Sequence, residues 1–181
     1  MPINFDLGEF NNNDIFIETG TYGGDTVKKA IDIGFKEIYS IEYDKSRYEK
    51  CKKMFEQYSN VTIIHGDSKI EIPKLLKNIN ASATFWLDAH YNADGAECSD
   101  EWCPLKGELE SIKEHYIKNH TILIDDMRLM DGEKFTYRGL MRYMPYKENI
   151  LKIVKEINNE YDISMLDGTI KNDVLCCRIK H

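Results

Sequence analysis

Residues 18–26 read ETGTYGGDT and combine an acidic residue with three glycines. An apolar run, residues 15–17, precedes this stretch, and a helical pattern follows it from about Asp25 to Ile33, where Gly34 is a stop signal. Glycines let a backbone approach a ligand closely and adopt positive φ angles. We therefore expect a strand, a ligand-binding loop and a helix here, although an ordinary tight turn would use the same glycines.

The acidic residue of this loop narrows the choice of ligand. A phosphate-binding Walker loop is excluded because no Lys-Ser/Thr pair follows the glycines, and the order of glycines differs from the dinucleotide fingerprint G-x-G-x-x-G. Glu18 lies two positions before the first glycine. A carboxylate at this place would repel a pyrophosphate and attract an ammonium or a sulfonium group.

Apolar strands and amphipathic helices alternate along the rest of the chain. We expect strands at 14–18, 36–42, 60–66, 83–89 and 120–126, and helices at 25–33, 44–59, 69–79, 104–117 and, with a weaker pattern, 146–158. Two further strands, 161–168 and 173–180, should form a hairpin through residues 168–172. This alternation predicts a single α/β domain, residues 1–181, with a doubly wound, Rossmann-like, seven-stranded, mostly parallel sheet and a C-terminal antiparallel hairpin.

Composition restricts the class of protein. The 181 residues are 42% hydrophobic, carry a net charge of −7 and contain no apolar run of membrane-spanning length. The first residues lack a signal-peptide profile. We expect a cytoplasmic protein with no membrane partner and no nucleic-acid partner, which would need a basic face. The five cysteines are interpreted as reduced thiols, because the spacing of Cys98 and Cys103 near His90 fits no zinc pattern.

Two later strand ends carry further acidic residues. Glu42 ends the second expected strand, where an acidic residue can bond the ribose hydroxyls of adenosine-type cofactors. Asp67 and Ser68 follow the third expected strand. Each has a simpler interpretation, since Glu42 could be a solvated strand-end carboxylate and Asp67 or Ser68 could cap the following helix.

These three motifs, in this order, resemble those of class I S-adenosylmethionine-dependent methyltransferases over nearly the whole chain. The first motif of that family is acidic-x-Gly-x-Gly-x-Gly, which Glu18, Gly20 and Gly24 match and Tyr22 interrupts. The resemblance implies S-adenosyl-L-methionine as the methyl donor, with Glu42 at the ribose and Asp67 at the adenine. The implied donor-binding residues are Glu18, Thr19, Gly20, Thr21, Tyr22, Gly24, Thr26, Glu42, Asp67 and Ser68.

Carboxylates also end the fourth and fifth expected strands. Neighbouring parallel strands would bring Asp88 close to Asp125 and Asp126, and converging carboxylates require protons or a cation. Ligands that are all oxygen favour a hard divalent ion such as Mg²⁺ or Mn²⁺, although an Asp-Asp pair can also cap a helix. The three positions resemble the metal ligands of macrocin-type and catechol-type O-methyltransferases, of which the macrocin type acts on sugars.

His90 is the candidate catalytic base, with Asp88 in reserve, although a lone loop histidine is more often structural. We expect metal-assisted O-methylation of a sugar, glycan or nucleotide-sugar, in a chain that could form homo-oligomers. The alternatives are a nicotinamide-dependent oxidoreductase, a metal-dependent hydrolase and a degenerate fold that only binds ligands. A nucleic-acid or protein acceptor stays open, but the Asn/Asp-Pro-Pro-Tyr motif of amino-group methyltransferases is absent after the fourth strand.

Overall fold

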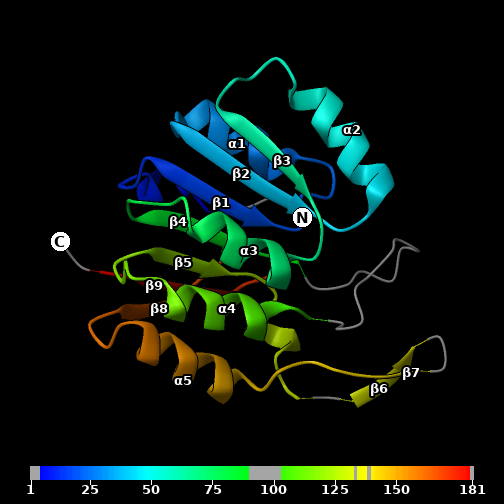
Figure 1. Cartoon of the computed structure of the whole chain (residues 1–181). Coiled ribbons are helices and arrows are strands. Elements are labelled where there is room, and N and C mark those ends of the chain that lie inside the picture. Colours follow the sequence, from blue (N-terminus) through cyan, green and yellow to red (C-terminus); the bar gives the residue numbers. More distant parts are fainter. Residues whose placement is uncertain (1–4, 90–102, 133, 138–139, 180–181) are drawn as a thin grey trace.

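The computed structural model describes residues 5–89, 103–132, 134–137 and 140–179, and for 134–137 and 140–143 it describes the backbone only. A seven-stranded sheet forms the centre of the molecule, in the order β3-β2-β1-β4-β5-β9-β8 (Figure 1). Its strands are β1 (Ile15–Thr19), β2 (Glu37–Glu42), β3 (Val61–His65), β4 (Ala83–Leu87), β5 (Thr121–Ile124), β8 (Asp162–Leu166) and β9 (Val174–Arg178).

The first five strands of the sheet are parallel, and β9 runs antiparallel to both β5 and β8. The predicted fold class is therefore confirmed, including the antiparallel C-terminal hairpin. The strand order also changes direction at β1, because the chain runs outward from β1 to β3 and then returns to add β4. Ligands of open α/β sheets bind beside such a switch point, at the carboxyl ends of the strands.

Helices cover both faces of the sheet (Figure 1). The helices are α1 (Asp25–Ile33), α2 (Lys45–Phe55), α3 (Ser68–Leu76), α4 (Leu105–Glu114) and α5 (Lys147–Ile157), with short 3₁₀ turns η1 (Leu7–Phe10) and η2 (Met127–Leu129). Helices α1 and α2 share one apolar cluster with η1, whereas α3, α4 and α5 share the other. None of the helices in the described ranges is long and apolar enough to cross a membrane.

Alternation of side chains along the central strands produces these two cores. Phe16 of β1 belongs to the apolar cluster that contains Val27 and Phe55. Its neighbour Ile17 belongs to the other cluster, with Ile72 and Leu109. All five residues of β1 are buried, as expected for a parallel strand covered by helices on both sides. The sheet therefore forms a buried base for the loops that leave its carboxyl ends.

Several elements are shorter than predicted, and two differences concern the candidate site and its surroundings. A second hairpin, β6 (Lys134–Tyr137) and β7 (Leu140–Tyr143), occupies part of the segment between the predicted strand 120–126 and the predicted helix 146–158, where no element was predicted. Figure 1 shows this hairpin projecting from the body of the molecule. Strand β4 ends at Leu87 rather than at residue 89, because its partner β5 ends at Ile124, directly opposite. Asp88 therefore lies just beyond the sheet.

Candidate active site at the carboxyl ends of the strands

The glycine-rich loop fits closely between the ends of β2 and β4. Gly20 has φ +86° and donates its N–H to the Ile41 carbonyl at 2.9 Å. A Cβ added to Gly20 would lie 2.5 Å from the main-chain oxygen of Asp88. Gly24 also has positive φ, and a Cβ there would lie 2.6 Å from the ring of Phe55. Both glycines are therefore required by geometry, with or without a ligand.

Glu18 lies beneath this loop rather than on its surface. Its side chain is 1% exposed, accepts a 2.6 Å hydrogen bond from the Ser40 hydroxyl and is also bonded by Thr26. Thr21 in turn lies 2.5 Å from the Ser40 hydroxyl. Burial raises the pKa of Glu18 from 4.5 to about 8, and the negative charge of Asp88 adds to this rise. Contact between Glu18 and the sulfonium or ammonium group of a bound methyl donor stays a prediction.

Glu42 determines the path of the same loop from the end of β2. Its carboxylate accepts the N–H of Tyr22 at 2.8 Å and the N–H of Asp44 at 2.9 Å. Burial raises the pKa of Glu42, although these two N–H bonds act in the opposite direction. The Tyr22 side chain is 52% exposed and its ring stacks under the Arg47 guanidinium, 4.5 Å from the ring centroid. Tyr22, which replaces the middle glycine, thus adopts φ +49° with its ring outside the core.

The third motif begins α3. Asp67 caps the helix, accepting the Lys69 N–H at 3.2 Å, so the capping interpretation is correct for this residue. Thr19, which ends β1, is buried and bonds the Asp88 N–H through its carbonyl at 3.2 Å. The Ser68 side chain is 4% exposed, and its hydroxyl has no hydrogen-bond partner within the described part of the chain. A buried hydroxyl without a partner costs desolvation free energy. A ligand that hydrogen-bonds to Ser68 would remove this cost.

Three carboxylates converge where β4 and β5 end. Asp88 follows β4, and Asp125 and Asp126 follow β5; each offers an oxygen within 4.8 Å of the oxygens of the other two. Asp125 and Asp126 are buried, and Asp88 is half-buried. The donor atoms are all oxygen, which fits Mg²⁺ or Mn²⁺ better than a softer metal. The predicted cluster is therefore present, and its occupation by a metal stays a prediction.

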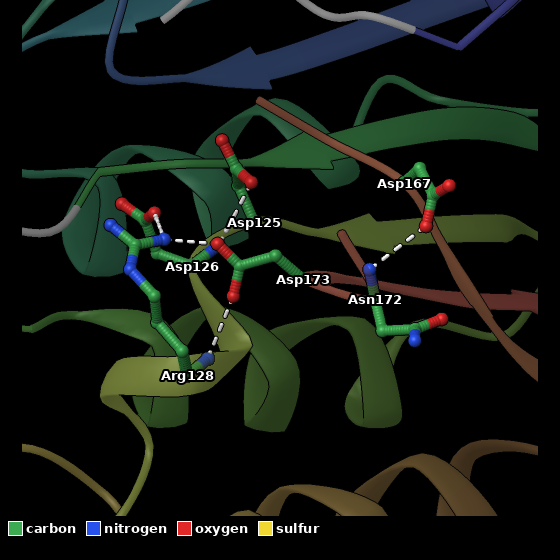
Figure 2. Close-up of polar contacts among 6 residues, drawn as sticks. All are labelled: Asp125, Asp126, Arg128, Asp167, Asn172 and Asp173. Atoms are coloured by element: carbon green, nitrogen blue, oxygen red, sulfur yellow. Dashed lines mark hydrogen bonds and ion pairs between the residues drawn. The ribbon is translucent and has the colours of Figure 1, made fainter. Parts of the chain in front are cut away.

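The sequence analysis did not place two further residues, Arg128 and Asp173, at this cluster. Figure 2 shows Arg128 lying between Asp126 and Asp173, and its Nη1 atom bonds a carboxylate oxygen of each. Asp173 directly precedes β9. A usable signal existed, because an antiparallel strand begins at the same edge where its parallel neighbours end. The first residue of the last predicted strand therefore belonged among the candidates.

A buried glutamate lies close to the same place. Glu108, in the first turn of α4, is 1% exposed and lines a small recess together with Leu87, Ala89 and Asp125. Ser40, which contacts Glu18, was likewise not singled out, and its sequence context gives no signal.

His90, the predicted base, lies outside the described residues, as does Cys98. The four described cysteines are free thiols.

Sequence comparison gives a partial match. No family model matches the chain. A ribosomal RNA small subunit methyltransferase A from Clostridium botulinum is 35% identical over 71 residues, which are 39% of this chain and 26% of that protein. A second strain of the same species carries a protein that matches equally well. The chain thus corresponds to about a quarter of the length of the curated relatives that it matches.

Solved structures match nearly the whole chain at low identity. The Podospora anserina methyltransferase PaMTH1, bound to S-adenosylhomocysteine, has a TM-score of 0.59 and 16% identity over 97% of this chain and 75% of its own. A candidate caffeoyl-CoA O-methyltransferase from Staphylococcus aureus has a TM-score of 0.61 and 15% identity over 96% of this chain and 79% of its own. Together with the strand order and the terminal hairpin, these likenesses show that the chain has the class I S-adenosylmethionine-dependent methyltransferase fold.

Proposed function

We propose that the protein transfers a methyl group from S-adenosyl-L-methionine to a hydroxyl of a sugar or glycan, with a divalent cation, Mg²⁺ or Mn²⁺, at the carboxylate cluster. The observation that carries this proposal is the proximity of two sites. Gly20, in the loop assigned to the methyl donor, lies against the main chain of Asp88, which belongs to the cluster assigned to the cation. Methyl transfer requires the donor and the activated acceptor to lie side by side, which two adjacent sites allow.

The donor assignment is supported by charge and by hydrogen-bonding capacity. Glu18 and Glu42 place carboxyl groups at the first two strand ends. A bound sulfonium or ammonium group would favour the charged form of a nearby carboxyl group, whereas the phosphates of a dinucleotide would disfavour it. Glu42 uses its carboxylate to hold two backbone N–H groups, and a carboxylate retains further lone pairs for ribose hydroxyls. Ser68 offers a buried hydroxyl near the end of β3.

The cation assignment is supported by the donor set of Asp88, Asp125 and Asp126, which are the residues that would hold it. A divalent cation there supplies Lewis acidity, which lowers the pKa of an acceptor hydroxyl. The acceptor oxygen forms a bond to the methyl carbon, and the electron pair of the broken C–S bond stays on sulfur. The proton of the hydroxyl goes to His90 or, failing that, to Asp88, which is half-buried beside the loop.

Two measurements test the proposal. Calorimetric titration with S-adenosylhomocysteine, with and without Mg²⁺, should show saturable binding, and no binding in either condition would refute the donor assignment. Transfer of a labelled methyl group to a panel of sugars and nucleotide-sugars should depend on Mg²⁺ or Mn²⁺. The variants Asp125→Ala and Asp126→Ala should abolish transfer and retain binding of S-adenosylhomocysteine, whereas equal loss of both would mean that the pair is structural.

Methylation of RNA is the second candidate, because the curated relatives with 35% identity are named as ribosomal RNA methyltransferases. The net charge of −7 weighs against a nucleic-acid acceptor. The segment after β4 begins Asp88-Ala89-His90-Tyr91 instead of the Asn/Asp-Pro-Pro-Tyr motif that amino-group methyltransferases use. A small-subunit ribosomal RNA transcript in the same labelling assay decides between the two acceptors.

A further inference from the structure

Asp173 lies at the candidate site, and neither the donor assignment nor the cation assignment uses it. We propose that Asp173 is a positioning residue for the cation site, acting through Arg128 on Asp126. It shares the Arg128 guanidinium with Asp126. It thereby keeps the Asp126 carboxylate oriented toward the cation while Arg128 neutralises the Asp126 charge only in part. This inference rests on the proposed function, because it assumes that Asp126 is a metal ligand.

The contacts make Arg128 a bridge between two buried carboxylates (Figure 2). Its Nη1 atom bonds one oxygen of Asp126 and one oxygen of Asp173. The Arg128 side chain is 34% exposed, whereas the side chains of Asp126 and Asp173 are each 3% exposed. A carboxylate has two oxygens, so Arg128 can hold one oxygen of Asp126 and leave the other for the cluster with Asp88 and Asp125.

The C-terminal hairpin brings Asp173 to this place. The turn before β9 is closed by the Asn172 N–H, which donates to the Asp167 carboxylate at 2.9 Å, and by the Asp173 N–H, which donates to the Leu166 carbonyl at 3.1 Å. The Asp173 carboxylate then accepts the backbone N–H of Arg128 at 2.8 Å. Asp173 is therefore fixed to both the backbone and the guanidinium of one residue.

Charge balance explains why a second aspartate is needed. An arginine paired with Asp126 alone would neutralise that carboxylate and compete with a cation for its oxygens. Asp173 supplies a second negative charge to the same guanidinium, which offsets the positive charge and spreads the contact over two partners. Arg128 can then orient Asp126 without cancelling it. Groups that orient metal ligands in this way typically change metal affinity about 10- to 100-fold when they are removed.

The test measures the affinity of Mn²⁺ by electron paramagnetic resonance and by calorimetry, without any turnover. Asp173→Asn keeps the size of the side chain and removes its charge, and it should weaken Mn²⁺ binding about 10- to 100-fold. Asp167→Asn is the matched control, because Asp167 lies in the same turn but contacts Asn172 instead of Arg128. The control should leave the Mn²⁺ affinity unchanged, and an equal loss in both variants would overturn the proposal.

A double-mutant cycle with Arg128→Gln separates positioning from the simple loss of a nearby charge. If Asp173 acts through Arg128, Asp173→Asn should change the Mn²⁺ affinity less than about 3-fold in the Arg128→Gln background. A loss of the same size in both backgrounds would mean that only the charge of Asp173 matters, and would overturn the proposal. Should Asp173→Asn fail to fold, Arg128→Lys replaces it, because lysine keeps the positive charge and loses the planar guanidinium that holds both carboxylates. This variant should bind Mn²⁺ more weakly, and an unchanged Mn²⁺ affinity would overturn the proposal.

The wild-type titration distinguishes failure of this inference from failure of the proposed function. If the wild-type protein binds no Mn²⁺, the cation assignment is wrong and this inference falls with it. If the wild-type protein and Asp173→Asn bind Mn²⁺ equally, only the role of Asp173 is wrong. Binding of S-adenosylhomocysteine by each variant reports that the fold and the donor site are intact.

Discussion

Gly20 lies directly against Asp88, so that a Cβ on Gly20 would come within 2.5 Å of the Asp88 carbonyl oxygen. Gly20 also has φ +86°, a backbone conformation that residues with a side chain rarely adopt. We predict that Gly20→Ala lowers the free energy of unfolding and abolishes binding of S-adenosylhomocysteine, because the loop must move away from β4. Urea unfolding and calorimetric titration measure the two effects.

Gly34→Ala is the matched control for this prediction. Gly34 has φ +94°, and a Cβ there meets nothing within 4 Å, so this variant isolates the cost of the backbone conformation, about 1 kcal/mol. Gly20→Ala should therefore be the more destabilising variant. Equal losses of stability in the two variants would show that the close approach of Gly20 to Asp88 contributes nothing.

Glu18 should make the protein less stable as the pH rises. Its folded-state pKa is about 8 against an ordinary value of 4.5, so between these pH values the folded state holds a proton that the unfolded state releases. Stability therefore falls as the pH rises from 4.5 to 8. Glu18→Gln, which cannot release a proton, should melt at a higher temperature than the wild type at pH 8 and at a similar temperature near pH 4.5. The same difference in melting temperature at both pH values would contradict the shift.

Ser68 should matter to the ligand more than to the fold. Its buried hydroxyl has no hydrogen-bond partner within the described part of the chain, so Ser68→Ala removes a desolvated group and should leave the stability of the ligand-free protein equal or higher. If the adenosyl group satisfies this hydroxyl, the variant should bind S-adenosylhomocysteine about 5- to 10-fold more weakly, the equivalent of about 1 kcal/mol. A clear loss of stability with unchanged affinity would assign Ser68 to the fold alone.

A pair of buried histidines predicts sensitivity to acid. His120 accepts the Ala83 N–H at Nδ1, which leaves its Nε2 to donate to Nδ1 of His115 at 2.9 Å, and His115 donates onward to the Ile79 carbonyl. Burial lowers the pKa of both histidines, that of His120 to about 3. The stability that depends on their neutral form is present above pH 6.5 and is lost as the pH falls toward 3.

Replacement of His120 tests this chain of hydrogen bonds. His120→Gln should cost about 1–3 kcal/mol at pH 7.5 because it leaves buried partners unpaired, and it should lose less additional stability than the wild type between pH 7.5 and pH 5. His65→Gln, at an exposed position on β3, is the control. Denaturant unfolding at the two pH values gives both quantities, and a parallel loss in wild type and variant would disprove the role of the pair.

The order of the central elements could be predicted from the sequence because apolar runs and amphipathic repeats follow one another regularly. The positions of Glu18, Glu42 and Asp67 at or next to the carboxyl ends of β1, β2 and β3 followed from the same pattern. The exact end of β4 could not be predicted, since it depends on where β5 stops opposite Leu87. The hairpin β6–β7 was missed because four-residue strands give too short an alternation to detect.

Contacts between segments distant in sequence were the other limit. Ser40 is a small polar residue inside an apolar strand, and only the register of β1 with β2 shows that it faces Glu18. In the bridge from Asp126 through Arg128 to Asp173, Arg128 and Asp173 lie 45 positions apart along the chain. Such contacts follow from the topology of the terminal hairpin rather than from a local motif.

The most direct test of the central claim is a crystal structure grown with S-adenosylhomocysteine and Mn²⁺, with anomalous data collected at the manganese edge. The account predicts one anomalous peak among the carboxylates of Asp88, Asp125 and Asp126, with the nucleoside lying over the loop 18–26 and its ribose beside Glu42. A map at saturating ligand with no peak at these three carboxylates, or with the nucleoside bound elsewhere, would contradict it.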